Sequence, residues 1–339
     1  MKSHQTTIRI CRLLLRNRGE ILSGGEIARV VSLSRQGVWK NIQALSQEGF
    51  SILSMPQKGY ILRDLPEYDL APSLVGAFIP ESCPWGREIH VFHSIPSTQE
   101  TAKGLGRRSG EEGVAVLAEE QTRGRGRRDR SWISIPGSGI FLSIFFRPRL
   151  LPGRLQLVNL AAGLAVRRAV QDMLGVTLSL KWPNDLLWNG RKVCGILSEA
   201  SSDSDRVRDC CTGIGMNVDL SRAEQGCRGL ENAAALREAA GPAAGPVHRG
   251  CLAAGIISRL FEDVASLERD GGKEILGRYR QECSTLGQEV CVVSDEGTAF
   301  GKALGIGENG ELLLERDGEV VPYCAADVIH ATMGQHSAS

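Results

Sequence analysis

The sequence of 339 residues has no apolar run that approaches the roughly 18 residues needed for a membrane span. Its ten cysteines show no CxxC spacing, and they form no metal-ligand cluster with the six histidines. Residues 1–20 lack the long apolar stretch and small-residue cleavage site of a signal peptide. These absences argue against a membrane protein and a disulfide scaffold, and they favour a cytoplasmic protein with free thiols.

Charge is unevenly distributed along the chain. Residues 1–64 hold ten Lys and Arg against four Asp and Glu, whereas the remainder holds thirty against thirty-five. A basic first fifth on an acidic remainder suggests that this end of the chain meets a polyanion. The length is sufficient for two or three domains, each with its own core.

Residues 1–64 have the pattern of a winged helix-turn-helix. Apolar residues at helical spacing predict three short helices, with Ser23 as N-cap of the second and Ser34 at the start of the third. Residues 51–62 follow as two short strands around a turn at residues 56–59, which is typical of a wing. We therefore expect a DNA-binding domain, with a winged helix that binds only protein as the alternative.

The helix-turn-helix spans about Gly24 to Gln43, and its second helix has the recognition role. The residues expected at the DNA are Ser34, Arg35, Gln36, Trp39, Lys40, Gln43 and Lys58.

The rest of the chain divides into three further parts. Residues 65–86 are predicted to form a linker with a short helix around residues 72–78, because prolines occur there at irregular spacing. Strand-like runs then alternate with helices over residues 87–284, which predicts an α+β domain. Over residues 285–333, short strands separated by Gly turns predict a small barrel.

Five arginines and two glycines occupy the eight positions 123–130, directly after a predicted strand. The loop is neither a Walker A motif nor a dinucleotide fingerprint. Because this part of the chain is acidic on balance, the arginines favour a small, highly charged ligand over nucleic acid. A solvated turn stays open as the alternative for the outer arginines Arg123, Arg128 and Arg130.

A second basic feature is the string KWPND at residues 181–185. Lys181 ends a predicted buried strand that stops at Pro183, so its ammonium needs an anion or a core carboxylate. Asp185 could be that partner or, through water, a ligand of Mg.

Four strings occur in the order and spacing of biotin protein ligases: STQ at 97–99, EEQTRGRGRRDRSW at 119–132, KWPNDLLWNGRKVCGIL at 181–197 and GIGMNV at 213–218. The chain resembles this family over nearly its whole length. With its winged helix it is similar to the bifunctional class, which is both ligase and biotin-operon repressor. The resemblance implies an α+β fold with a class II synthetase-like catalytic domain. It also implies a C-terminal SH3-like barrel that supports ATP and carrier binding.

The activity implied by the resemblance has two steps. Biotin and ATP, with Mg, form biotinyl-5′-adenylate and pyrophosphate, and a lysine of a biotin carboxyl carrier protein then takes the biotin. The implied partners are this carrier, operator DNA and a second copy of the chain when the adenylate is bound. Two alternatives stay open: a ligase for another acid such as lipoate, and a ligand-sensing regulator without ligase activity.

Motif matching implies roles for individual residues. Those at biotin are Ser97, Thr98, Gln99, Gln121, Arg125, Gly126, Arg127 and Lys181. Those at ATP or the adenylate are Arg125, Trp132, Lys181 and Asn217. Lys181 and Arg127 are implied to be catalytic, and the loop around Arg125–Arg127 is implied to close over the adenylate.

Two residues depart from the family pattern. Gln99 stands where the family usually has Asn, one methylene shorter, and this difference puts one biotin contact in doubt. Asp129 stands in place of a common Gly and puts loop dynamics in doubt. Arg316, in a turn near the C-terminus, receives no predicted contact.

Overall fold

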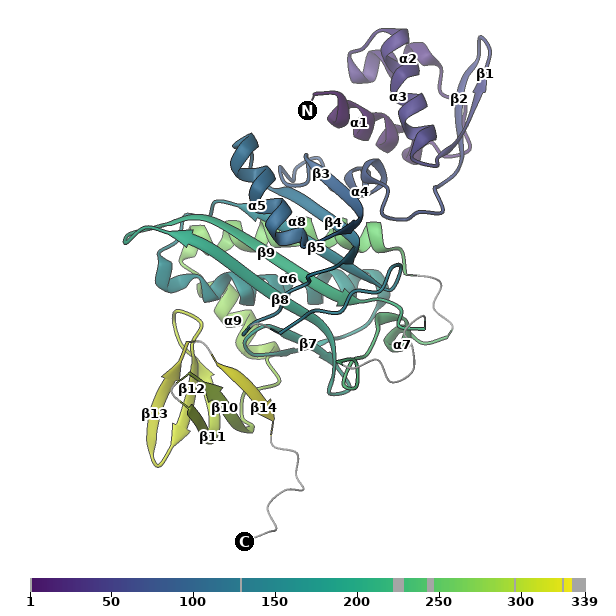
Figure 1. Cartoon of the computed structure of the whole chain (residues 1–339). Helices are drawn as coiled ribbons and strands as arrows, with labels where there is room; N and C mark the ends of the chain where they lie inside the picture. The colour runs from purple at the N-terminus through teal and green to yellow at the C-terminus, as the bar shows by residue number, and fades with distance from the viewer. Residues whose placement is uncertain are drawn as a thin grey trace.

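The computed structural model describes residues 2–128, 130–221, 229–242, 247–295, 297–324 and 326–330. Asp129 therefore lies outside the described residues. Figure 1 shows three parts in succession, from the N-terminal helices at the top to a small β-domain at the bottom. The predicted α+β fold with a winged helix and a C-terminal β-domain is confirmed. Within the described part of the chain, no helix has the length and apolarity to cross a membrane.

The N-terminal part is a winged helix. Its elements are α1 (Lys2–Arg16), α2 (Gly24–Val31), α3 (Arg35–Gln47), β1 (Ser51–Met55) and β2 (Gly59–Asp64). Ser23 caps α2 in a reciprocal capping box with Glu26, and the Ser34 hydroxyl accepts a hydrogen bond from the Gly37 N–H at the start of α3. Both helix starts were predicted from these serines. β1 and β2 pair antiparallel as the predicted wing.

Helix α4 (Pro72–Phe78), also predicted, connects the winged helix to the central part. Arg12 of α1 donates hydrogen bonds to three backbone oxygens at the C-terminal end of α4, those of Gly76, Ala77 and Ile79. At the other end, the Glu48 carboxylate accepts from the Ser73 N–H and hydroxyl at 2.8 and 2.7 Å. The segment predicted as a linker is therefore bound firmly to the winged helix.

The central part is built on a seven-stranded sheet with the order β3-β4-β5-β9-β8-β7-β6. The strands are β3 (Ile89–Ile95), β4 (Val114–Gln121), β5 (Gly139–Phe146), β6 (Ser179–Lys181), β7 (Asp185–Trp188), β8 (Arg191–Ser202) and β9 (Val207–Asn217). Only β3 and β4 pair in parallel, and the remaining neighbours are antiparallel. The strand predicted to stop at Pro183 is β6, which ends at Lys181; the chain then turns, and β7 returns antiparallel beside it.

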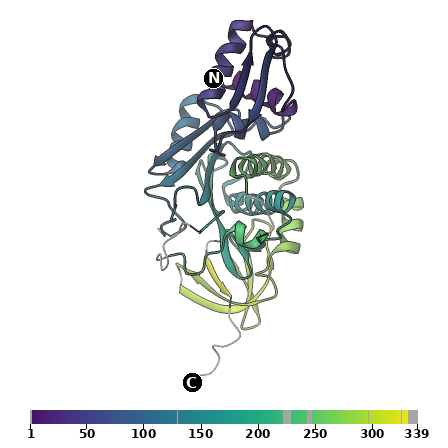
Figure 2. The same cartoon turned by 90° about the vertical axis from the view of Figure 1, so that its right-hand side faces the viewer.

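Helices cover both faces of this sheet. They are α5 (Thr98–Ser109), α6 (Gln156–Leu174), α7 (Leu236–Ala240), α8 (Arg249–Asp270) and α9 (Lys273–Glu282), with a short 3-10 turn at Pro152–Arg154. Figure 2 shows α6 and α8 stacked on one side of the sheet. Alternating residues of β4 separate the two cores: Ala115 and Leu117 pack into the large core with α6, and Val114 and Val116 pack with Ala102 of α5.

The C-terminal part is a five-stranded antiparallel sheet in the order β13-β12-β11-β10-β14. Its strands are β10 (Glu289–Ser294), β11 (Gly297–Ile306), β12 (Leu312–Arg316), β13 (Glu319–Tyr323) and β14 (Asp327–His330). Its inner face joins the core around α6, and the buried Trp182 indole donates to the Gly310 oxygen at 2.9 Å. The C-terminal sheet is thereby docked beside the end of the hairpin β6-β7.

Candidate active site

A cavity of about 410 Å³ opens on the α5 face of the central sheet. Most of the predicted ligand-binding residues line it, although they are spread over more than a hundred positions of the chain. The predicted residues in its wall are Ser97, Thr98, Gln99, Gln121, Arg125, Gly126, Arg127, Trp132, Asp185 and Asn217. Lys181 is the one predicted ligand-binding residue that is not among them.

One end of the cavity is a buried polar network at the start of α5. The Gln121 side-chain oxygen accepts from the Thr98 N–H at 2.9 Å and from the Thr98 hydroxyl at 3.0 Å. The Thr98 and Ser143 hydroxyls are 2.8 Å apart, and Ser97 is the N-cap of α5. These side chains are held by one another before any ligand binds, so this end is preorganised.

Gln99 lies in the same wall, and the structure shows what its extra methylene reaches. The Gln99 Nε2 donates to the Leu197 oxygen of β8 at 3.2 Å and to the Cys211 oxygen of β9 at 3.0 Å. A Cβ added at Gly213 would lie 3.0 Å from the Gln99 Oε1. The longer side chain thus spans two strands, and it fits because residue 213 has no side chain.

The middle of the cavity has an aromatic side chain over a floor of glycines. Gly195 of β8 and Gly215 of β9 are register partners, and the Trp132 ring packs against both. A Cβ at Gly215 would approach this ring to 2.5 Å, and one at Gly195 to 2.9 Å. The glycines therefore make room for Trp132, which explains the GIG spacing physically.

The other end of the cavity is the arginine loop, here defined as residues 123–130. It folds as a tight hairpin: the Gly126 N–H donates to the Arg130 oxygen, and the Trp132 N–H donates to the Gly124 oxygen. Arg128 lies at the turn with φ of +50°.

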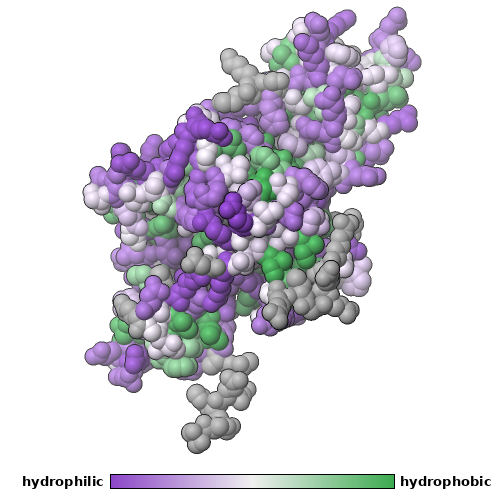
Figure 3. All heavy atoms as spheres, in the orientation of Figure 1, coloured by the Kyte–Doolittle hydropathy of each residue, from purple (hydrophilic) through white to green (hydrophobic). Residues whose placement is uncertain are grey.

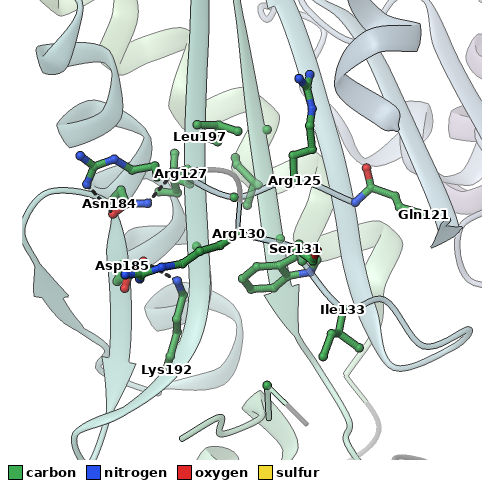
Figure 4. A pocket seen from close by; sticks show the side chains of 18 of the residues that line it. Gln121, Arg125, Arg127, Arg130, Ser131, Ile133, Asn184, Asp185, Lys192 and Leu197 are labelled. Atoms are coloured by element: carbon green, nitrogen blue, oxygen red, sulfur yellow. Dashed lines mark hydrogen bonds and ion pairs between the residues drawn. The ribbon is translucent and has the colours of Figure 1, made fainter. Parts of the chain in front are cut away.

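The arginines of this loop contact two different parts of the molecule. Arg125 pairs with Glu100 of α5 and Glu199 of β8, and Figure 4 shows it pointing away from Arg127 and Arg130. Arg127 and Arg130 instead face Asp327 of the C-terminal sheet.

Arg127 is the most enclosed of these arginines, with 19% of its side chain exposed. Burial lowers the pKa of its guanidinium, and the Asp327 carboxylate opposes this shift. Its Nη1 donates to the Ala326 oxygen at 3.1 Å and the Asn184 Oδ1 at 3.4 Å.

The lysine in the wall of the cavity is Lys192; Lys181 is not part of this wall, and its predicted contact with the ligand stays a prediction. Lys192 of β8 lines the wall, and its Nζ lies 2.7 Å from the Asp185 carboxylate and 5.5 Å from the centre of the Trp132 ring. Figure 4 shows Lys192 reaching toward Asp185. Lys181 lies beside the C-terminal sheet, where burial lowers its pKa and the carboxylates of Asp185 and Asp327, both in the cavity wall, oppose this shift. The turn after Lys181 is the reason, because it brings Asn184 and Asp185 to the cavity.

Two further parts of the wall were not predicted. One is the segment 229–233, which is tied to β8 because the Lys192 N–H donates to the Asn232 oxygen at 2.8 Å. The other is Asp327 of β14. Asn217, which was predicted, donates from its side chain to the Lys192 oxygen at 3.4 Å. Lys192 itself stands in the quoted string NGRKVCGIL, so a sequence signal for it existed.

The carboxylates near the lysine and the arginines do not form a metal centre. Asp185 is paired with Lys192 and Asp327 with Arg130, and the described residues contain no cluster of three or more potential ligands. The predicted contact of Asp185 with Mg through water stays a prediction. The nine cysteines within the described ranges are all free, as predicted for them.

The second candidate site is the exposed side of the winged helix. The residues predicted at DNA are all exposed, whereas Val38, Ile42 and Leu45 of α3 are buried. Figure 3 shows mainly hydrophilic side chains over the visible face of this domain. Trp39, 51% exposed, stands among them as a large apolar side chain without a packing role.

Comparison with known proteins gives matches along almost the entire chain. A protein named bifunctional ligase/repressor BirA from Bacillus subtilis is 32% identical over 322 residues, which cover 91% of this chain and 94% of the relative. The protein of the same name from Escherichia coli is 29% identical and covers 97% of this chain and 98% of its own length.

The chain belongs to the biotin protein ligase family.

Models of protein families match each part of this ligase. Residues 6–61 match an HTH domain, residues 91–217 match the biotin/lipoate A/B protein ligase family, and residues 285–331 match the biotin protein ligase C-terminal domain. A solved structure of the Aquifex aeolicus biotin protein ligase in complex with biotin and ATP is 27% identical, with a TM-score of 0.61. It covers 72% of this chain and 99% of its own. The family predicted from the sequence motifs is thus confirmed.

Proposed function

We propose that this ligase activates biotin with ATP to biotinyl-5′-adenylate and then transfers biotin to a lysine of a carrier protein. One observation supports this most strongly: a single cavity joins a closed, uncharged polar end to an end lined by arginines and a lysine. Such a cavity suits a ligand with a neutral polar head and an acidic tail beside a polyphosphate. The related ligase from Aquifex aeolicus binds biotin and ATP, as its name states.

In the first step, an oxygen of the biotin carboxylate attacks the α-phosphorus of ATP. A phosphorus–oxygen bond forms, the bond to the bridging oxygen breaks, and pyrophosphate leaves. Both reactants are anionic, so the approach needs fixed positive charge. Lys192 and Arg127 are the cations that we assign to this work, and each charge-assisted hydrogen bond contributes about 1.5–3 kcal/mol. Arg125, which is already paired with Glu100 and Glu199, is assigned a smaller share.

In the second step, the neutral amine of the carrier lysine attacks the carbonyl carbon of the adenylate. The amide bond forms, the bond from carbon to the AMP oxygen breaks, and a proton leaves with the products. The mixed anhydride is open to hydrolysis until the amine arrives, so water has to be kept out. We assign that role to the arginine loop and to Trp132.

The closed end recognises the neutral ring of biotin in this proposal. Ser97, Thr98, Gln99 and Gln121 are the residues that we assign to the ureido group. Because the Gln99 Nε2 already donates to two backbone oxygens, Gln99 offers its Oε1 to the ligand as an acceptor.

We also propose that the chain represses transcription. The adenylate acts as corepressor, two chains dimerise when it is bound, and two copies of α3 reach two half-sites of an operator. The support is the basic winged helix with its exposed Arg35, Trp39 and Lys40, together with the HTH-domain match.

The test of the ligase proposal is the exchange of labelled pyrophosphate into ATP. We expect exchange that depends on biotin and does not occur with lipoate. Lys192→Ala is compared with Lys181→Ala, which removes the ammonium that the sequence predicted at the ligand but that does not line the cavity. We expect loss of about 100-fold or more in Lys192→Ala, the range seen when one electrostatic donor is removed from an active site.

Two results would count against this reading. Absence of biotin-dependent exchange in the wild type contradicts the ligase function and favours a DNA-binding sensor. Loss in Lys181→Ala but not in Lys192→Ala contradicts the assignment of Lys192 and restores the prediction made from the sequence.

A further inference from the structure

The C-terminal sheet contributes one side chain to the cavity. Asp327, the first residue of β14, lies in the same wall as Arg127 and Lys192. Its side chain is 17% exposed, so its carboxylate is largely withdrawn from water. A carboxylate in the wall of a site for phosphates is unexpected, since it repels such a ligand unless its charge is compensated.

Two arginines compensate Asp327. The Arg130 Nη2 lies 2.7 Å from its Oδ2, and the Arg127 Nη1 lies 3.5 Å from its Oδ1. The backbone oxygen of the preceding residue, Ala326, accepts a hydrogen bond from the same Arg127 nitrogen. The three charged groups together carry a net charge of +1, so the group as a whole still attracts an anion.

The contacts of Arg127 show whether Asp327 orients this guanidinium or occupies the nitrogens that a phosphate would bind. Every contact that Arg127 makes with described side chains or backbone oxygens uses Nη1, with Asn184, Ala326 and Asp327 as partners. Within the described residues, its Nε and Nη2 make no hydrogen bond. These two nitrogens form the edge of a guanidinium that binds a phosphate in a bidentate manner. The carboxylate therefore holds one edge and leaves the other for a ligand.

We propose that Asp327 is a positioning residue of the ligase site, which holds Arg127 and Arg130 toward the phosphates of ATP. This proposal rests on the function proposed above. It makes the anion-binding end of the cavity a joint product of two domains, complete only when the C-terminal sheet is docked.

The chain offers a matched control in Asp295. This carboxylate, also in the C-terminal part, pairs with Arg128 of the same loop at 3.0 Å. Neither Arg128 nor Asp295 lines the cavity, and the Asp295 side chain is 94% exposed. Asp295→Asn thus removes a link between loop and C-terminal sheet without touching the cavity.

The experiment is calorimetric titration with α,β-methylene-ATP, which cannot be cleaved at the reacting bond, in the presence of saturating biotin. The full chain is compared with Asp327→Asn, Asp327→Glu and Asp295→Asn. We expect Asp327→Asn to weaken binding of the analogue about tenfold, the cost of about one hydrogen bond to a charged group. Asp327→Glu restores most of the affinity, Asp295→Asn matches the wild type, and biotin affinity is unchanged in all three variants.

Each outcome decides the proposal. Unchanged affinity in Asp327→Asn would overturn it, and tighter binding would overturn it by showing that the carboxylate competes with the phosphates. An equal loss in Asp295→Asn would reduce the role to general attachment of the loop. If Asp327→Asn loses affinity for both biotin and the nucleotide analogue, that variant is misfolded, and Asp327→Glu decides. If Asp327→Glu also fails to bind the analogue with near wild-type affinity, the positioning role is contradicted. Because binding is measured without turnover, a wild type that binds the analogue but lacks pyrophosphate exchange refutes the ligase function alone.

Discussion

The two ends of the cavity are built in different ways. At the closed end, Thr98, Gln121 and Ser143 are buried or half-buried, belong to one domain and satisfy one another through short hydrogen bonds. At the arginine end, exposed side chains such as Arg130 form ion pairs across a domain boundary. A buried network specifies one arrangement, whereas exposed ion pairs contribute little stability and exchange partners easily.

The difference suits the two proposed ligand parts. A neutral ring is recognised by donors and acceptors whose places are set before binding. A polyphosphate whose charge grows during reaction is served by cations near the cavity mouth, and Arg127 keeps one edge of its guanidinium for a ligand oxygen while Asp327 holds the other. Gly195 and Gly215, under the Trp132 ring, lie between the two ends of the cavity. A substitution there is expected to disturb both ends at once.

Gly215→Val is expected to have the largest effect, because its side chain occupies the position of the Trp132 ring. Since a misplacement of about 1 Å can cost about 100-fold in rate, we expect a loss of that order in biotin-dependent pyrophosphate exchange. Gly104→Val, on α5 where a Cβ meets nothing within 4 Å, is the control for a change of glycine alone. Pyrophosphate exchange at the wild-type rate in Gly215→Val would show that the reaction does not depend on the position of the Trp132 ring.

Thr98→Val tests the closed end alone. It keeps the shape of the side chain and the backbone N–H that donates to the Gln121 oxygen, but it removes the hydroxyl that links this oxygen to the Ser143 hydroxyl, a cost of about 1–3 kcal/mol. We expect the KM for biotin to rise about 10-fold or more while the KM for ATP stays within about twofold. Thr101→Val, on the same helix but outside the cavity, is the control. A rise in both KM values would contradict the separation of the two ends.

Ionic strength separates the ends without a mutation. Raising the salt from 0.05 to 0.5 M shortens the screening length, and this weakens attraction between ATP and the exposed arginines. We expect the KM for ATP to rise several-fold, on the order of 5-fold, and the KM for biotin to change little. Steady-state exchange kinetics at four salt concentrations measure both values. Equal salt dependence of the two constants would refute the contrast.

Arg125→Gln is expected to have the smallest effect. Arg125 is 46% exposed and already paired with Glu100 and Glu199, and exposed pairs of this kind are worth about 0–1 kcal/mol. We expect the KM for ATP to rise about two- to threefold, with no change in thermal stability beyond about 1 °C. A loss as large as that of Gly215→Val would show that Arg125 leaves these carboxylates and binds the reacting groups directly.

Much of the fold could be predicted from local patterns. The capping serines Ser23 and Ser34 marked where α2 and α3 begin, since a hydroxyl N-cap satisfies free N–H groups at a helix start. The glycine-marked turns of the C-terminal part were likewise visible. The stop of the strand at Pro183 was also predicted, but the antiparallel return of β7 was not, because a strand pattern does not show how a chain continues after a proline.

The candidate site could be predicted only in part. Motifs identified the wall from Ser97 to Trp132 and Asn217, because these residues stand in compact strings. Which of Lys181 and Lys192 lines the cavity could not be read from spacing alone, since both lie in the same string. The register of β7 and β8 brings Lys192 into the wall.

The amino-acid sequence by itself determined the order of the three parts, the family and the chemistry available to the arginine loop. These follow from helix caps, apolar periodicity and short strings, which act over a few neighbouring residues. Only the tertiary structure decided that Gln99 reaches β8 and β9, that Gly195 and Gly215 lie side by side under Trp132, and that Asp327 holds Arg127. Those contacts join residues far apart in the chain, and their distances are set by sheet register and by the docking of one domain on another.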